Sequence, residues 1–240
     1  MTASEFSQQT RDKLMQVSTA TLTTALFRIG LRNVFLQGVQ RLGDGPNMVG
    51  PAYTLRYIPA REDLDVLDSF ANRENPQRKG VEECPAGSVF VIDSRGDASA
   101  ASAGGILATR LQMRGCAGIV TDGGFRDSPE IAALAMPAYH TRPSAPTNLT
   151  KHHAVALNDP IACGGVAVFP GDILVGDAEG VVCIPAHLAD QIANDAHEMT
   201  VFEDFVLERV QAGQSIFGLY PPTDPATKEA FKDWRAKAGR

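Results

Sequence analysis

Apolar residues in the segment from 7 to 30 recur at mixed helical spacing. The repeating positions are Leu14, Val17, Leu22, Leu26 and Ile29. This spacing predicts a helical segment that ends at Gly30, a residue type typical of helix C-caps. Ser18 and Thr19 interrupt the segment, and they predict two helices, the second of which begins at a hydroxyl cap.

A period of two replaces the helical spacing at "MVGPAYTLRYI", residues 48–58. This alternation predicts a strand that follows a turn. A charged stretch over residues 59–84 comes next, and we expect it to be a loop with one short helix in "DLDVLDSFA", residues 63–71.

Strand and helix patterns alternate regularly beyond Pro85. The successive segments are "GSVFVIDS" (87–94), "SAGGILATRLQMRG" (102–115), "AGIVTDG" (117–123) and "SPEIAALA" (128–135). Alternation of this kind predicts βαβ units and an α/β fold with a partly parallel sheet.

The last third of the chain predicts short strands followed by a long helix. Residues 154–185 contain apolar runs separated by Gly, Asp and Pro turns. Residues 186–211 form an amphipathic pattern on Leu188, Ile192, Val201, Phe205 and Val206. We expect one domain over residues 1–240, with residues 212–240 as a C-terminal extension that docks on another surface through its aromatic side chains.

Composition narrows the class of protein. The 240 residues are 44% hydrophobic, which suffices for a substantial core. No run approaches the roughly 20 apolar residues of a membrane span, and the N-terminal segment "MTASEFSQQTRDK" is polar, so we expect a cytoplasmic protein without a membrane partner. The net charge of −6, with scattered basic residues, argues against a nucleic-acid partner.

The four cysteines, Cys84, Cys116, Cys163 and Cys183, share no CxxC or zinc spacing. Three of them stand in apolar surroundings. We interpret all four as reduced core residues, since a buried cysteine behaves as a small hydrophobe.

The stretch "GIVTDGGFRDSPEI", residues 118–131, is the strongest candidate for chemistry. Arg126 and Asp127 follow a predicted parallel strand, and α/β sheets bind ligands at this end. Asp127 offers an oxygen ligand for Mg²⁺ or Mn²⁺, and Arg126 a planar fork for a carboxylate or enolate oxygen. The alternative is structural: Asp127 and Glu130 match a capping box, although Ser128 is an equally good N-cap.

A second candidate is the helix start in "SAGGILATRL", residues 102–111. Gly104 and Gly105 leave the first amides of the helix free, and the helix dipole favours an anion there. The amides of Ile106 and Leu107 are the natural donors. The alternative is that the two glycines only allow tight packing against the sheet.

Other polar residues are weaker candidates. His152 and His153 are adjacent in sequence, so their side chains are expected to point apart, although one of them could reach a substrate as an acid or base. Asp93, Asp97, Asp172 and Asp177 follow strands, and the last two sit in ordinary turn sequences, so we interpret Asp172 and Asp177 as structural.

Several of these stretches together resemble the RraA-like family. They are "MVGPAYTL", "PAGSVFVID", "AGGILATRLQMRGCAGIVTDGGFRD" and "VAVFPGDILVGDAEGVVCIP", within residues 15 to 200, and the most specific pattern is G-x-x-x-D-G-G-x-R-D. This family contains class II 4-hydroxy-4-methyl-2-oxoglutarate aldolases and regulators of ribonuclease E activity. The resemblance implies an α/β domain with a swivelling β/β/α-like core.

The resemblance also implies an oligomer and a set of site residues. It implies a homotrimer or homohexamer with sites between subunits, in which Asp127 binds the metal and Arg126 contacts the pyruvyl group. Backbone amides at Ile106 and Leu107, after Gly104 and Gly105, would hold the substrate carboxylate. An acidic residue on the neighbouring subunit's long helix would reach the metal through water. Glu203 is the preferred match for this residue and Glu198 the second.

Two positions depart from the pattern of the aldolases. Gly105 stands where the aldolases usually carry an acid for proton transfer, and Thr24 where many members have aspartate. The regulators often lose the metal-ligating aspartate, whereas "RD" is intact here.

The sequence therefore predicts a lyase that uses Mg²⁺ or Mn²⁺ to cleave or decarboxylate a 2-oxo acid, such as 4-hydroxy-4-methyl-2-oxoglutarate or oxaloacetate, to pyruvate. The alternatives are a non-catalytic regulator of the ribonuclease type and a metal-dependent sugar-acid lyase or dehydratase. The second is considered because the loop at 59–84 and the C-terminal extension can shape a different pocket.

Overall fold

An eight-stranded mixed sheet organises the computed structural model, which describes residues 6–240. Residues 1–5 of the polar N-terminal segment lie outside the described residues. The strands run in the order β1-β7-β5-β3-β2-β12-β13, and β9 also pairs with β2. Their bounds are β1 Gln40–Leu42, β2 Met48–Pro59, β3 Val89–Asp93, β5 Gly118–Thr121, β7 Ala138–His140, β9 His152–Leu157, β12 Ile173–Gly176 and β13 Val181–Ile184. This arrangement confirms the predicted α/β class.

The centre of the sheet is parallel and its margins are antiparallel. The parallel pairs are β2 with β3, β3 with β5, and β5 with β7. Helices connect these strands: α3 (Pro76–Glu83) precedes β3, α4 (Gly105–Met113) precedes β5, and α5 (Ser128–Ala132) precedes β7. Strands β3 and β5 are buried along their whole length, as expected for parallel strands covered on both faces.

Two smaller sheets complete the strand content. Strands β10 (Ile161–Cys163) and β11 (Val166–Val168) form an antiparallel pair. Strands β4 (Ala101–Ala103), β6 (Gly124–Phe125) and β8 (Arg142–Pro143) form a short parallel sheet. This short sheet matters for function because the segments that follow β4 and β6 carry the candidate residues.

The N-terminal segment forms two helices, α1 (Gln8–Leu14) and α2 (Thr19–Arg28). Ser7 and Ser18 cap them through their side-chain oxygens, so the predicted break at residues 18–19 is confirmed. Both helices pack on α6 (Ala189–Gln211), which follows the short 3₁₀ helix η3 (Ala186–Leu188). The long helix predicted over 186–211 is thus confirmed, and Ile192, Val201 and Phe205 are among its buried residues.

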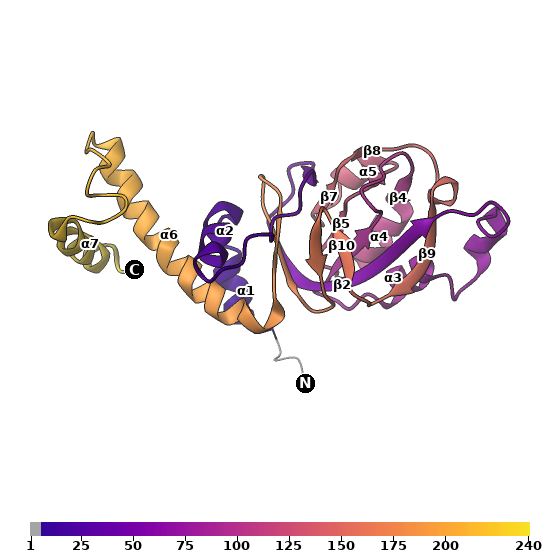
Figure 1. Cartoon of the computed structure of the whole chain (residues 1–240), viewed down its shortest axis with the longest axis horizontal. Helices are drawn as coiled ribbons and strands as arrows, with labels where there is room; N and C mark the ends of the chain where they lie inside the picture. Colours follow the sequence, from indigo (N-terminus) through magenta and orange to yellow (C-terminus); the bar gives the residue numbers. More distant parts are fainter. Residues whose placement is uncertain (1–5) are drawn as a thin grey trace.

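The C-terminal extension packs on the outer half of α6. Helix α7 (Pro225–Ala238) brings Phe231 and Trp234 against Phe205, with ring centroids 5.5 and 5.7 Å away. Figure 1 shows α6 running away from the sheet, with α7 at its far end and α4 and α5 on the opposite side of the molecule. The surface on which the extension docks is therefore a helix of its own chain.

The charged stretch 59–84 differs from its prediction. The short helix expected at 63–71 is a 3₁₀ helix, η1 (Leu67–Ala71), and the expected loop contains α3, which the apolar pattern did not show. Asn75 caps α3 and Pro76 occupies its first turn, a combination that starts helices without any apolar periodicity. A second 3₁₀ turn, η2 (Asn148–Thr150), precedes β9.

The cysteines and the turn aspartates have the structural surroundings expected of them. All four cysteines are buried and free. Asp172 accepts hydrogen bonds from the backbone N–H of Phe169 and Ala186, and Asp177 accepts one from the N–H of Thr19. None of the helices in residues 6–240 is both long and apolar enough to cross a membrane.

Candidate functional site

The short parallel sheet brings the two sequence candidates together. Gly104 and Gly105 follow β4, while Arg126 and Asp127 follow its parallel neighbour β6. The Arg126 N–H donates to the carbonyl of Ala103 at 3.1 Å, which fixes one segment beside the other. The candidate pair therefore follows β6 of this small sheet, and β5, the strand predicted to precede it, ends earlier, at Thr121.

Asp127 does not cap helix α5 with its side chain. It occupies the N-cap position, but the side chain accepts no hydrogen bond from that helix, so the capping-box alternative is wrong. Its Oδ2 instead accepts a hydrogen bond of 3.1 Å from the N–H of Gly105. The backbone of Asp127 is left-handed, with φ 55°, a conformation that aspartate tolerates better than most side chains.

Arg126 and Asp127 form a loose ion pair at the surface of a pocket. The Arg126 Nε lies 3.6 Å from Asp127 Oδ1, and the two side chains are 46% and 42% exposed. Both therefore remain accessible to a ligand. Gly104 is required here, because a Cβ on it would lie 2.7 Å from Arg126 Cγ and 2.8 Å from Asp127 Oδ2.

The start of helix α4 offers one free amide to the pocket. The N–H of Leu107 donates to the carbonyl of Gly104 at 3.1 Å, so the prediction that the Leu107 amide is free was wrong. The Gly105 amide is used by Asp127. Within residues 6–240 the amide of Ile106 has no acceptor, and it is the one left to bind an anion at this helix N-terminus.

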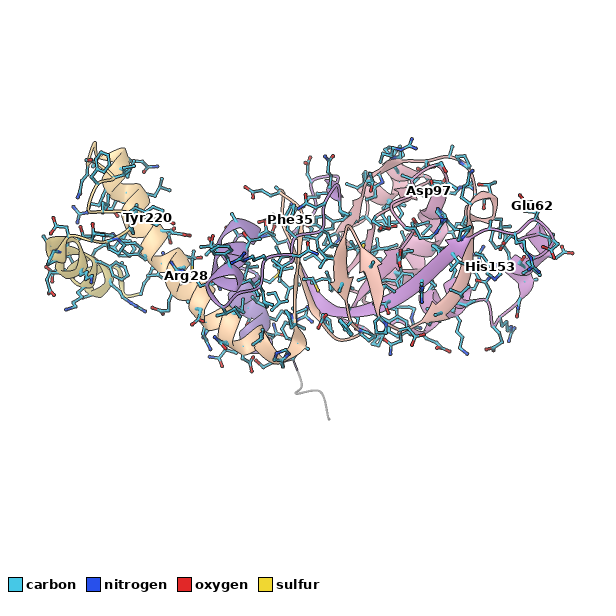
Figure 2. The ribbon with its side chains drawn as sticks, viewed as in Figure 1. Arg28, Phe35, Glu62, Asp97, His153 and Tyr220 are labelled. Atoms are coloured by element: carbon cyan, nitrogen blue, oxygen red, sulfur yellow. The ribbon has the colours of Figure 1, made fainter. Side chains whose placement is uncertain are left out.

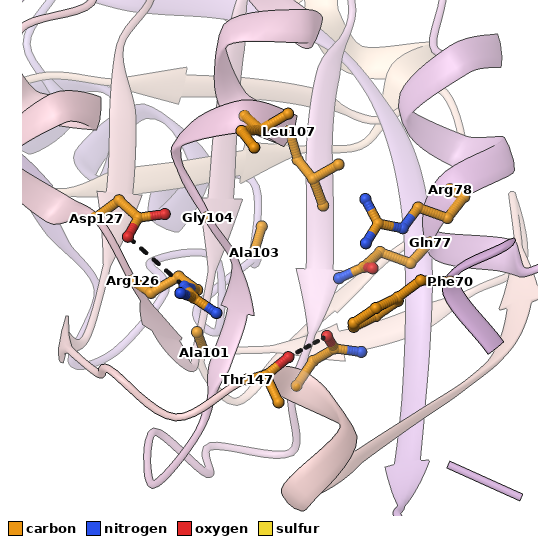
Figure 3. Close-up of a pocket in the computed structure, with 12 residues that line it drawn as sticks. Phe70, Gln77, Arg78, Ala101, Ala103, Gly104, Leu107, Arg126, Asp127 and Thr147 are labelled. Carbon is orange, nitrogen blue, oxygen red and sulfur yellow. Dashed lines mark hydrogen bonds and ion pairs between the residues drawn. The ribbon is translucent and has the colours of Figure 1, made fainter. Parts of the chain in front are cut away.

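The pocket has a volume of about 210 Å³. It is lined by Phe70, Gln77, Arg78, Ala101, Ala103, Gly104, Ile106, Leu107, Arg126, Asp127, Thr147 and Asn148. Figure 3 shows Arg126 and Asp127 on one side, with Gln77, Arg78 and Phe70 on the other.

Besides Ala101 and Ala103 of β4, sequence reasoning missed five lining residues, namely Phe70, Gln77, Arg78, Thr147 and Asn148. They come from the charged stretch and from the loop before β9. The "NP" pair at 75–76 is a helix-start signal that points to α3. No sequence signal relates α3 to the segment after β6, because their proximity depends on the packing of α3 and α4.

The two acidic residues considered on α6 lie elsewhere in the chain. Glu203 accepts hydrogen bonds from Thr21 Oγ1 at 2.8 Å and from the hydroxyl of Tyr220 at 3.3 Å. Glu198 forms a bidentate ion pair with Arg235 at 2.7 and 2.9 Å. Neither lines the pocket of Asp127. In Figure 2, Tyr220 lies beside α6 at one end of the molecule, while Asp97 and His153 lie at the other.

The two adjacent histidines are engaged outside the pocket. His152 is buried and stacks on Tyr57 at 5.1 Å between ring centroids, and burial lowers its pKa. His153 pairs with Asp65 at 2.8 Å. Neither lines the pocket, so the candidate acid or base is not provided by either side chain in this arrangement.

Among the residues that line the pocket, Asp127 offers a carboxylate that suits a hard divalent cation. No group of three or more His, Cys, Asp or Glu side chains in residues 6–240 is arranged to hold a metal ion. Mg²⁺, however, commonly uses one or two protein carboxylates and completes its shell with water and substrate oxygens. Asp127 supplies one such carboxylate, and its Oδ1 accepts no hydrogen bond from residues 6–240.

Comparisons with known proteins agree with this fold and identify the family. The family model described as "RraA-like: Aldolase/RraA" matches residues 19–183. A protein of Halalkalibacterium halodurans named "Putative 4-hydroxy-4-methyl-2-oxoglutarate aldolase" is 34% identical over 167 residues, which are 70% of this chain and 73% of that protein.

Two solved structures are similar over most of the chain. Streptomyces coelicolor RraAS2, described as an unusual member of the RNase ES inhibitor RraA protein family, has a TM-score of 0.73 and 32% identity, and the match covers 83% of this chain and 96% of that one. An uncharacterized protein from Pseudomonas syringae has a TM-score of 0.81 with 22% identity, covers 92% and 97% of the two chains, and shows the fold alone. The chain therefore belongs to the RraA-like family.

Proposed function

We propose that this protein is a divalent-metal-dependent lyase that cleaves or decarboxylates a 2-oxo acid, such as 4-hydroxy-4-methyl-2-oxoglutarate or oxaloacetate, to release pyruvate. The observation that carries the proposal is the meeting of Arg126, Asp127 and the free Ile106 amide in one pocket. The name of the Halalkalibacterium halodurans relative supports the same class of reaction.

The Arg126 guanidinium and the free Ile106 amide can bind the two polar groups of a pyruvyl unit, its keto oxygen and its carboxylate. The Ile106 N–H and the dipole of α4 favour the carboxylate at C1. The Arg126 guanidinium donates to the oxygen on C2. When the C3–C4 bond breaks, its electron pair moves into the C2–C3 bond and negative charge collects on that oxygen. A preorganised guanidinium at this point lowers the barrier, because the charge develops beside a donor already in place.

Asp127 is the residue that would hold Mg²⁺ or Mn²⁺. The Gly105 N–H on Oδ2 orients the carboxylate and leaves Oδ1 available. When bound, the metal would supply Lewis acid chemistry at the 2-oxo acid.

Proton transfer distinguishes the two candidate reactions. Retro-aldol cleavage removes the proton of the 4-hydroxyl group, whereas decarboxylation of oxaloacetate releases CO₂ and needs no base at that step. In both reactions C3 of the enolate then takes up a proton, which water can supply, to give pyruvate. Gly105 provides no acid or base for this proton, so the chain by itself is better equipped for decarboxylation.

The site fits an oligomer in which a neighbouring copy adds a second acid. Ile106 at the pocket is 84% exposed in a single chain, so the mouth of the pocket is open to a neighbouring copy. A homotrimer or homohexamer would allow the neighbour's Glu203, or its Glu198, to approach Asp127. This arrangement extends the proposal, and subunit mixing tests it.

A pyruvate-release assay tests the proposed function. The substrates are oxaloacetate, 4-hydroxy-4-methyl-2-oxoglutarate and a set of 2-oxo deoxy sugar acids, each with Mg²⁺, with Mn²⁺ and with EDTA. We expect release from at least one of the first two, and loss of it in EDTA. Release from the sugar acids alone would favour the sugar-acid lyase alternative. No release from any substrate with either metal would exclude this lyase activity.

The non-catalytic alternative is a regulator of a ribonuclease. It is supported by the description of the Streptomyces coelicolor structure, which is 32% identical. Inhibition of ribonuclease E cleavage by the purified protein, together with no pyruvate release, would support this alternative over the lyase.

A further inference from the structure

The pocket carries a second arginine that the chemistry above does not use. Arg78 lies in the first turn of α3, and it lines the pocket across from Arg126 and Asp127. The same wall of the pocket also contains Phe70 and Gln77, so this wall is built from the charged stretch that precedes β3.

An aromatic ring holds the Arg78 side chain in place. The guanidinium carbon lies 4.4 Å from the centre of the Phe70 ring, a close cation–π contact. The Asn75 side chain caps the same turn by accepting from the backbone N–H groups of Gln77 and Arg78. The cap thus fixes the backbone from which the side chain extends, and the Phe70 ring covers one face of the guanidinium. The edge of the guanidinium remains available to a ligand.

Arg78 has no acidic partner in the part of the chain that the structure describes. Within residues 6–240 it forms no ion pair, its side chain donates no hydrogen bond, and its buried Nε lacks an acceptor. The arginines at 61, 110, 235 and 240 by contrast each pair with an acidic residue. A partly buried cation without a counter-charge is unfavourable unless a ligand supplies the anion.

The turn around Arg78 is fixed to the sheet. Gln77 is almost fully buried, and its Nε2 donates to the hydroxyl of Tyr57 and to the carbonyl of Ser102, each at 2.8 Å. Burial raises the pKa of Tyr57, so its hydroxyl keeps the proton that it donates to Ser102. These bonds fix the turn, and the Phe70 ring orients the Arg78 side chain, so the guanidinium is preorganised in the pocket.

We propose that Arg78 determines substrate specificity by binding a second carboxylate, at the end of the 2-oxo acid remote from Arg126. The expected ligand is a dicarboxylic 2-oxo acid, whose planar carboxylate matches the planar guanidinium edge in a way that an ammonium group does not. The reaction of this ligand rests on the proposed function, but its binding to Arg78 does not.

The first experiment compares two substrates that differ only at the distal end. They are 4-hydroxy-4-methyl-2-oxoglutarate and 4-hydroxy-4-methyl-2-oxovalerate, which has a methyl group where the other has the distal carboxylate. In the full chain with Mg²⁺, Arg78→Met should lower the preference in kcat/KM for the dicarboxylate by about 10- to 100-fold, mainly through KM, as for loss of a charge-assisted hydrogen bond. Arg78→Lys should restore only part of it.

A matched control uses the next cation along the chain. Lys79 pairs with Glu74 at 2.8 Å and does not line the pocket. Lys79→Met therefore removes one positive charge next to Arg78 and should leave the preference unchanged. An equal loss of preference in this control would assign the effect to general charge and overturn the proposal.

Calorimetric binding of unreactive acids separates this inference from the reaction. We expect 2-oxoglutarate to bind more tightly than 2-oxobutyrate, with and without Mg²⁺, and Arg78→Met to abolish the difference while the melting temperature confirms folding. If this pattern appears but no substrate is turned over, the proposed function fails and the Arg78 site stands. Equal binding of the two acids to the unaltered protein, or no binding of either, would overturn the site.

Discussion

The Asp127 carboxylate accepts a hydrogen bond of 3.1 Å from the N–H of Gly105, a residue 22 positions earlier in the chain. This contact joins the end of β6 to the start of α4. It turns the carboxylate away from α5, the helix that Asp127 precedes, and into the pocket. The residue is therefore positioned for a ligand at the expense of a local helix cap.

Asp127→Asn should remove metal-dependent turnover and leave the fold intact. Asparagine tolerates the left-handed backbone at φ 55° and can accept the Gly105 hydrogen bond through its amide oxygen, but it lacks the charge that Mg²⁺ prefers. We expect kcat/KM for oxaloacetate to fall at least about 100-fold, with a melting temperature within about 4 °C of the original. A variant that melts much earlier yet keeps its activity would make Asp127 a structural residue.

Arg126→Lys should lower kcat more than it raises KM. An ammonium group keeps the charge but cannot reproduce the planar donor at the 2-oxo oxygen, where charge develops as the bond breaks. Steady-state kinetics with oxaloacetate and Mg²⁺ should show a loss of about 10-fold or more in kcat. An unchanged kcat/KM would remove Arg126 from the mechanism.

Gly104→Ala should damage the site, while Gly105→Ala serves as its matched control. A Cβ at residue 104 would lie 2.7 Å from Arg126 Cγ, whereas the nearest atom to a Cβ at residue 105 is Asp127 Cβ at 3.3 Å. Gly104 has an extended backbone that any residue can adopt, so its substitution acts through crowding alone. We expect the greater loss of kcat/KM at residue 104. A larger effect at residue 105 would contradict the crowding argument.

Acidification should destabilise the protein through buried histidines. Burial lowers the pKa of His140 and of His152, so below the ordinary value of about 6.5 the unfolded chain binds more protons than the folded protein. The free energy of unfolding then falls as pH drops from about 6.5 toward the folded pKa. Asp122, whose pKa burial raises, has the opposite dependence above the ordinary aspartate value.

A His140→Phe variant isolates the histidine contribution. His140 stacks on Phe125 at 5.4 Å, and its buried Nδ1 has no partner within residues 6–240, so phenylalanine keeps the stacking and removes the titrating group. The decrease in melting temperature between about pH 7.5 and about pH 5.5 should be smaller than in the unaltered protein. An equal decrease in both proteins would show that His140 does not contribute.

Subunit mixing tests whether the site is shared. Asp127→Asn and Glu203→Gln are expected to be inactive alone, and after subunit exchange about one quarter of the interfaces in a cyclic oligomer would pair intact residues. Activity measured after exchange should recover in that proportion. If exchange is demonstrated and activity does not return, with Glu198→Gln tested in the same way, the second acid does not come from a neighbouring copy.

The sequence by itself determined the local structure of this protein. The hydroxyl cap at Ser18, the alternation in residues 48–58, the buried parallel strands and the long helix from residue 189 were all predictable, because each depends on residues close together in the chain. The pair Arg126 and Asp127 was also recognisable, since its residue types and flanking glycines lie in one short stretch.

Only the tertiary structure decided what surrounds that pair. Because β4 pairs with β6, the Asp127 carboxylate accepts a hydrogen bond from Gly105 and not from its own helix, and the Ile106 amide is left free. Arg78 reaches the pocket because α3 packs beside α4. The charged residues of α3 show no apolar periodicity from which this helix could be predicted. Contacts of this kind join segments that are distant in sequence, and their geometry is set by the packing of the whole sheet and its helices, which no local pattern encodes.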